Sequence, residues 1–184
     1  MIAATTKDGF EPQLERFFHE FPAKTKDMPA PTLDPKTTLY DALETIDEIV
    51  ETLFEHLDRL YLGAGARNFV LLDVPSLDRS PGALDQEEIS SEIRESCKEW
   101  NEAMKSGIRD FSKISKEANM RLFSSERFLS NILDSPEDYG FDEADTCLEN
   151  GAIWADELHL ATEVHRLLAK ELIQALDTEL RNAA

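Results

Sequence analysis

The sequence has little of several features, and each shortage narrows the classes of protein to which it can belong. No apolar run approaches the roughly 20 residues of a membrane span, so no spanning segment is expected. The first residues, Met1 to Asp8, have neither a basic start nor an apolar stretch, which argues against a signal peptide. Only 19 basic residues stand against 38 acidic ones, and the net charge of −19 disfavours nucleic acid and anionic membrane surfaces as partners.

Cysteine and histidine are also scarce. The two cysteines, Cys97 and Cys147, can pair or stay free, and they do not fix the redox compartment, so the cellular location stays open. No group of His, Cys and Asp has the spacing of metal ligands, so neither a metal nor another cofactor is expected.

What is present suits one globular domain. A chain of 184 residues with 41% apolar residues can build a core, and we expect a single domain over residues 1–184. Residues 11–21 have the period of a short amphipathic helix. Four prolines between residues 22 and 35 predict a surface connection.

The remaining pattern alternates helices and strands. Helices are predicted over 42–62, with Asp41 as N-cap, and over 86–118; two shorter helices follow, one at 128–133 and one after Thr162. The acidic face of the first, from Glu44 to Asp58, is predicted to be a solvated surface.

A short, almost continuous apolar run at 68–74 predicts a buried parallel strand, and residues 119–124 are a candidate second strand. The alternation of helices and strands predicts an α/β fold with parallel strands. Two strands are too few for a stable sheet, so at least one edge of the predicted sheet needs additional strands that this sequence pattern does not supply. An all-α domain would require 68–74 to be helical, which its length and flanking glycines disfavour.

An acid and a histidine lie three residues apart in Asp156-Glu157-Leu158-His159. This is the arrangement of a catalytic base and its orienting acid in one class of serine hydrolase, because histidine exchanges protons near neutral pH. The same spacing also fits an Asp that caps a helix start, with a His packed nearby.

Three segments together resemble the SGNH, or GDSL, ester hydrolases, and most closely the fungal acetylesterases of the carbohydrate-esterase type. The first runs from Leu60 to Pro75 and continues in Asp78-Arg79-Ser80-Pro81; the second is Trp100-Asn101; the third joins Tyr139-Gly140-Phe141 to 153–159. The resemblance implies the C-terminal portion of a three-layer, flavodoxin-like SGNH fold that is helix-rich with few parallel strands.

The resemblance also implies roles. In the family the Asp-x-x-His motif supplies the base and its acid, so His159 would take a proton from a nucleophilic serine and Asp156 would orient the imidazole. The substrate would be a small acyl ester or an acetylated carbohydrate, and members of the family are often secreted.

The sequence departs from the family where the nucleophile and the oxyanion donors should be. It contains no Gly-Asp-Ser and no Gly-x-Asn-Asp, so we expect the N-terminal part of the domain to be missing and the chain alone to be inactive. Ser76 and Ser80 are weak substitutes, since nothing in the sequence places a base beside them. The alternative is a non-catalytic, truncated pseudoenzyme that binds a partner or self-associates through an exposed sheet edge.

Overall fold

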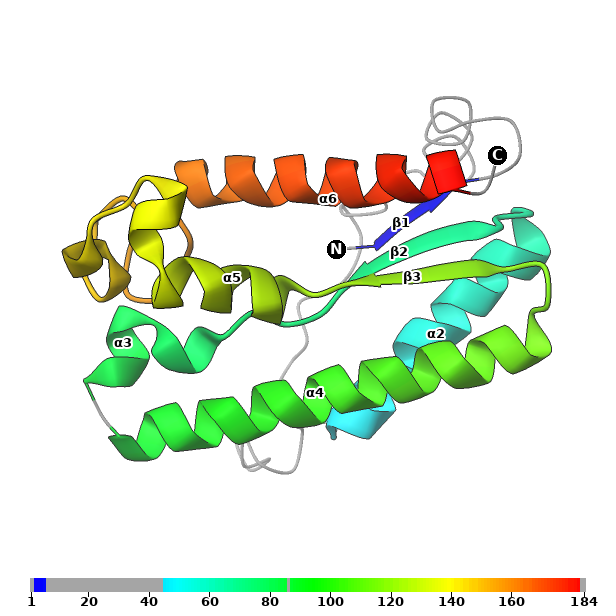
Figure 1. Cartoon of the computed structure of the whole chain (residues 1–184). Coiled ribbons are helices and arrows are strands. Elements are labelled where there is room, and N and C mark those ends of the chain that lie inside the picture. The colour runs from blue at the N-terminus through cyan, green and yellow to red at the C-terminus, as the bar shows by residue number, and fades with distance from the viewer. Residues whose placement is uncertain (1, 6–44, 86, 183–184) are drawn as a thin grey trace, which may run out of the picture. The chain divides into compact units, whose positions relative to one another are not determined.

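The structure is a computed structural model that describes residues 2–5, 45–85 and 87–182. The helix predicted over 11–21 and the connection predicted over 22–35 lie outside the described residues. The elements follow one another in the order shown in Figure 1. They are β1 (Ile2–Thr5), α2 (Ile46–Gly63), β2 (Asn68–Leu72), a 3-10 turn (Leu77–Arg79), α3 (Pro81–Leu84), α4 (Glu87–Ile114), β3 (Asn119–Phe123), α5 (Ser125–Asp134), two further 3-10 turns (Pro136–Tyr139 and Glu143–Thr146) and α6 (Thr162–Asn182).

The sheet confirms both predicted strands and adds one that was not predicted. β2 and β3 run parallel: the amide of Asn119 donates to Arg67 at one end, and the amide of Asp73 donates to Phe123 at the other. β1 pairs antiparallel with the other edge of β2, with Ile2 opposite Leu71 (Figure 1). A segment of four residues is too short to show the alternation of a strand, so β1 could not be predicted from its own sequence.

The fold is α/β and helix-rich, as predicted. The three-layer, flavodoxin-like arrangement stays a prediction, as does a single domain over the whole chain. Two compact units emerge from the contacts: the first holds the chain up to Leu71 together with 103–121, and the second holds 72–102 together with 122–184.

The first unit is built around aromatic rings. Phe111 of α4 lies within 6.1 Å, between ring centres, of Phe54 and Tyr61 on α2 and of Phe69 on β2. Aromatic pairs at such distances add to the stabilisation that burial alone provides. They fix α2 and the C-terminal half of α4 against the same strand.

The start of α2 differs from its prediction. Thr45, and not Asp41, is the N-cap: its hydroxyl accepts from the amide of Glu48, whose carboxylate accepts from the amide of Thr45. Because this capping box satisfies two free amides at once, the helix begins at Ile46. It ends at Gly63, one residue beyond the predicted end, and Gly65 then takes a left-handed conformation (φ 70°) that lets the chain turn into β2.

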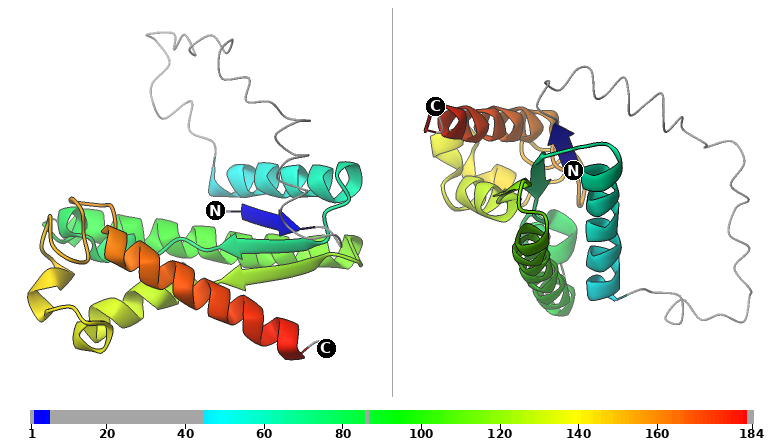
Figure 2. Two further views of the ribbon diagram at one scale, coloured as in Figure 1. Left: turned by 90° about the horizontal axis from the view of Figure 1, so that it is seen from above. Right: turned by 90° about the vertical axis from the view of Figure 1, so that its right-hand side faces the viewer.

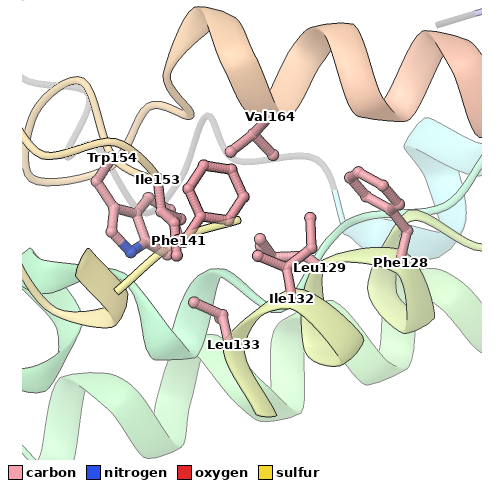
Figure 3. Packing of buried hydrophobic residues seen from close by; sticks show 8 residues of the cluster. All are labelled: Phe128, Leu129, Ile132, Leu133, Phe141, Ile153, Trp154 and Val164. Carbon is pink, nitrogen blue, oxygen red and sulfur yellow. The ribbon is translucent and has the colours of Figure 1, made fainter. Parts of the chain in front are cut away.

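The second unit has its own hydrophobic core. α5 presents one apolar face to the loop before α6 and to the first turn of α6 (Figure 3). The buried residues are Phe128, Leu129, Ile132, Leu133, Phe141, Ile153, Trp154 and Val164. Trp154 and Ile153 have no exposed surface, and they stand immediately before the Asp-x-x-His segment. The core therefore anchors one end of the loop that carries Asp156 and His159.

Candidate active site

Asp156 and His159 form a side-chain pair. Nδ1 of His159 lies 2.9 Å from Oδ2 and 3.0 Å from Oδ1 of Asp156. A carboxylate that faces Nδ1 favours the tautomer with the proton on that nitrogen. The lone pair of Nε2 is then left for a proton that comes from elsewhere. This is the geometry in which an imidazole can act as a general base.

The pair lies at the tip of a closed loop. Trp154 and Leu160 form an antiparallel bridge, and the amide of Ala155 donates to the carbonyl of His159 at 2.8 Å. Below the bridge, the indole nitrogen of Trp154 donates to the carbonyl of Thr146 at 3.0 Å. These bonds close the loop at its base, so the orientation of the pair is coupled to the core.

Backbone amides hold the carboxylate as well. Oδ1 of Asp156 accepts from the amide of His159 at 2.7 Å and from that of Leu158 at 2.9 Å, which is a turn that Asp commonly forms with the residues that follow it. These amide bonds, first that of His159 and then that of Leu158, lower the pKa of Asp156 from 3.8 to about 2, and the imidazole contact adds to them. The carboxylate is therefore ionised at neutral pH.

The alternative in which Asp156 caps a helix and His159 packs nearby does not describe this geometry. α6 begins at Thr162, beyond the pair, and Asp156 bonds the amides of its own loop. The side chains of His159 and Asp156 are 75% and 52% exposed, so the histidine is not a packing residue. An exposed imidazole beside a fixed carboxylate is accessible to a substrate.

A hollow of about 240 Å³ surrounds the pair. Glu149, Glu157 and Leu158 line it together with Asp156 and His159. Three carboxylates around one imidazole give the hollow a negative potential, which disfavours anionic substrates and favours neutral or cationic ones.

A second segment supports the loop from below. The amide of Gly82, in α3, donates to the carbonyl of Glu157 at 2.9 Å. A Cβ at position 82 would lie 3.1 Å from that oxygen and 3.2 Å from Cβ of Glu157, so a larger residue would push against the loop. No pattern in the sequence predicts this contact, because the fold brings together residues that lie 75 positions apart.

The two candidate substitute serines are not placed to react. Ser76 is 7% exposed, and its hydroxyl lies 2.7 Å from that of Ser130 and 3.3 Å from the carbonyl of Glu126. Ser80 is 1% exposed, and its hydroxyl caps α3 by accepting from the amide of Ala83. Both hydroxyls are buried and bonded to groups other than His159.

A buried polar cluster follows the end of β2. Oδ1 of Asn101 accepts from the amide of Val74 at 2.8 Å, and its Nδ2 donates to the carbonyl of Val74 at 3.0 Å and to Glu126 at 3.3 Å. Asp73 accepts from the amide of Glu126 at the start of α5. The Trp100-Asn101 segment, singled out from the sequence, thus contributes an amide that clamps the chain as it leaves the strand.

The two cysteines, left open from the sequence, are both free thiols. Burial raises the pKa of the Cys97 thiol, and a hydrogen bond to the backbone of Leu77 opposes this only in part. A raised pKa keeps Cys97 in its unreactive, protonated form. Cys97 therefore does not act as a nucleophile in this form.

Two searches of the described residues found nothing. No three His, Cys, Asp or Glu side chains within 2–5, 45–85 and 87–182 gather as metal ligands would. Among the helices that the structure describes, none combines the length and the apolar character needed to cross a membrane.

Comparison with known proteins found a partial similarity to an acetylesterase. No family model matches the chain. An acetylesterase from Thermothelomyces thermophilus is 31% identical to it over 117 residues, which are 61% of this chain and 38% of that protein. The chain thus matches well under half the length of this relative. It is similar to part of an esterase.

Proposed function

We propose that this chain carries the base and the orienting acid of an SGNH-type ester hydrolase, and that its substrate class is a small acyl ester, such as an acetyl group on a carbohydrate. The contact between Asp156 and His159 carries the proposal, since both carboxylate oxygens lie within 3.0 Å of Nδ1 and Nε2 faces away from them. The similarity to an acetylesterase supports the same class of reaction.

In each half of the proposed reaction, His159 accepts one proton and returns it. As a serine oxygen attacks the acyl carbon, Nε2 of His159 accepts the hydroxyl proton and then gives it to the departing alcohol. Nε2 next accepts a proton from the water that attacks the acylated serine, and it returns this proton to the serine oxygen as the acid leaves. Asp156 keeps Nδ1 protonated and stabilises the imidazolium that exists between each acceptance and return.

We further propose that no serine of this sequence fills the nucleophile's role. The sequence has no Gly-Asp-Ser, and the hydroxyls of Ser76 and Ser80 are buried against other partners. Each missing oxyanion donor would cost a further ~10²–10³-fold in rate. The chain by itself is therefore expected to be inactive, or nearly so.

The first experiment measures hydrolysis of p-nitrophenyl acetate by the purified chain. The wild type, His159→Ala and His165→Ala are expected to give the same low rate, and a fluorophosphonate probe should label no serine. His165 is the matched control, because it is also exposed and its Nδ1 lies 3.1 Å from the carbonyl oxygen of Ala161 rather than beside a carboxylate. Robust turnover that His159→Ala abolishes would show that a serine in this chain does react.

The second experiment tests the dyad itself. In a chimera, residues 45–182 of this chain replace the corresponding part of the Thermothelomyces thermophilus acetylesterase, which supplies its own remaining residues. The chimera should hydrolyse p-nitrophenyl acetate, and His159→Ala should reduce kcat at least about 10³-fold while His165→Ala changes it less than about twofold. A folded chimera that is inactive, or indifferent to His159→Ala, would contradict the proposal and favour the non-catalytic alternative.

A further inference from the structure

A groove of about 670 Å³ lies within the first unit. It runs between α2 and the C-terminal half of α4, two helices that can be followed in Figure 2. The helices touch where a Cβ at Gly107 would lie only 2.1 Å from the ring of Phe54, so only glycine allows this approach. The groove follows that contact, and none of its lining residues belongs to the dyad.

The floor of the groove is apolar. Val50, Phe54, Phe111 and Ile114 supply its apolar lining; Val50 and Phe111 are 4% and 7% exposed, whereas Ile114 is 83% exposed. Ala103, Ser106 and Gly107 on α4 are small and leave the floor accessible. An apolar groove between two helices is a surface that an amphipathic helix can cover when it binds.

The rim of the groove is acidic. Asp47, Glu51, Glu55 and Asp58 follow one another along one side of α2, and Asp110 stands on α4. Of these five carboxylates, Asp110 is paired with Lys113 at 2.7 Å, and Arg59 is the one basic residue that lines the groove within the described part of the chain. The acidic face that the sequence predicted to be merely solvated thus borders an apolar floor.

The acidic rim determines which kind of helix can bind in the groove. The chain's own amphipathic segment, residues 11–21, has three Glu and one Arg, so it would bring acids beside acids. A second copy of a chain with net charge −19 is repelled in the same way. We propose that the groove binds an amphipathic helix of a partner protein, with apolar residues at i, i+3 or i+4 and i+7 and with Lys or Arg along its flanks.

The test uses a defined probe, a fluorescein-labelled helical peptide of Leu and Lys in which every Leu lies on one face. Fluorescence anisotropy with the full chain in 0.15 M salt should show binding of one peptide per chain. The variant Asp47→Asn/Glu51→Gln/Glu55→Gln/Asp58→Asn, which neutralises the rim, should weaken binding at least about tenfold. Ser106→Trp, which fills the groove and keeps every charge, should weaken it by a similar factor.

The controls separate this groove from general attraction to an acidic protein. Glu87→Gln/Glu88→Gln/Glu92→Gln/Glu99→Gln removes the same charge from exposed positions of α4 outside the groove, and at a Debye length of ~8 Å it should change the affinity less than about twofold. A peptide of the same composition with its Leu residues scattered around the helix should bind at least about tenfold more weakly. Circular dichroism and urea unfolding confirm that each variant is folded.

Three results would overturn the proposal. The two charge variants could weaken binding equally, or Ser106→Trp could have no effect although the protein is folded; either would mean that the peptide binds elsewhere. Phe17→Ser/Phe18→Ser could tighten binding tenfold or more, which would mean that the chain's own segment occupies the groove. The expected result for Phe17→Ser/Phe18→Ser is an unchanged affinity.

Discussion

Asp73 and Asp156 both lie in the second unit and both accept hydrogen bonds from backbone amides, but their surroundings differ. Asp73 is 5% exposed, and its bond to the amide of Glu126 joins the end of β2 to the start of α5. The side chain of Asp156 is 52% exposed, and its bonds stay within its own loop. The carboxylate of Asp73 connects segments that are far apart in the sequence. The carboxylate of Asp156 stabilises the exposed end of its own loop.

The neighbours of the two aspartates differ in the same way. Asn101, 2% exposed beside Asp73, uses both its oxygen and its nitrogen in bonds to the protein. Of the two ring nitrogens of His159, beside Asp156, only Nδ1 takes part in the hydrogen bonds found among the described residues. A buried side chain whose polar atoms are all hydrogen-bonded, such as Asn101, contributes to stability. An exposed imidazole with one nitrogen outside these bonds, such as that of His159, can exchange a proton with a substrate. The predictions below test this difference.

The largest effect is expected where the core holds the loop that carries Asp156 and His159. Trp154→Ala should lower the free energy of unfolding by about 3–5 kcal/mol, because it removes the indole of a fully buried side chain and its bond to Thr146. Urea unfolding followed by circular dichroism measures the loss. Trp100→Ala, at a half-buried tryptophan on α4, is the matched control and should cost less. Equal losses for the two variants would show that the core does not anchor the loop as described.

The next effect separates the two polar clusters. Asn101→Ala should cost about 1–3 kcal/mol, because it leaves the buried amide and carbonyl of Val74 without partners. His159→Ala, at an exposed position, should change stability by less than about 0.5 kcal/mol. The same urea unfolding measurement serves both variants. A loss for His159→Ala as large as that for Asn101→Ala would make the dyad a structural pair.

A smaller effect depends on pH. Because the pKa of Asp156 falls from 3.8 to about 2 on folding, its charge stabilises the folded chain above pH 3.8, and this contribution is lost as the pH falls toward 2. The difference in stability between the wild type and Asp156→Asn should therefore be complete at pH 5 and shrink over that window. Urea unfolding at a series of pH values measures it.

The variant His159→Ala distinguishes the two causes of the low pKa of Asp156, the backbone amides and the imidazole. The backbone amide of residue 159, the largest cause of the low pKa, survives that substitution. Most of the lowering of the pKa of Asp156 should therefore persist in His159→Ala. A carboxylate that returns to a pKa near 3.8 in this variant would show that the imidazole, and not the loop, holds it.

Sequence reasoning succeeded where the pattern was local. The run at 68–74 has the composition of a buried strand, and β2 occupies most of it. The spacing of Asp156 and His159 lets their side chains meet within one turn, and they do meet. In both cases the information lies within a few neighbouring residues.

Sequence reasoning failed where the chain folds back on itself. The bonds of Asn101 to Val74 and of Gly82 to Glu157 join residues far apart in sequence, and no period announces them. The start of α2 was misplaced because Asp41 with Glu44 and Thr45 with Glu48 have the same capping pattern. From the sequence, the acidic face of α2 could not be distinguished from an ordinary solvated helix face. The groove beside it depends on α4, which is distant in the sequence.

The central claim is that Asp156 fixes His159 with its base nitrogen free, and the ¹⁵N chemical shifts of the ring measure this most directly. At pH 8 the account predicts a protonated Nδ1 and an unprotonated Nε2 for His159 in the wild type. Asp156→Ala should shift the ring toward the tautomer with the proton on Nε2, while the shifts of His165 stay unchanged. A wild-type ring that already carries its proton on Nε2, or that does not respond to Asp156→Ala, would contradict the account.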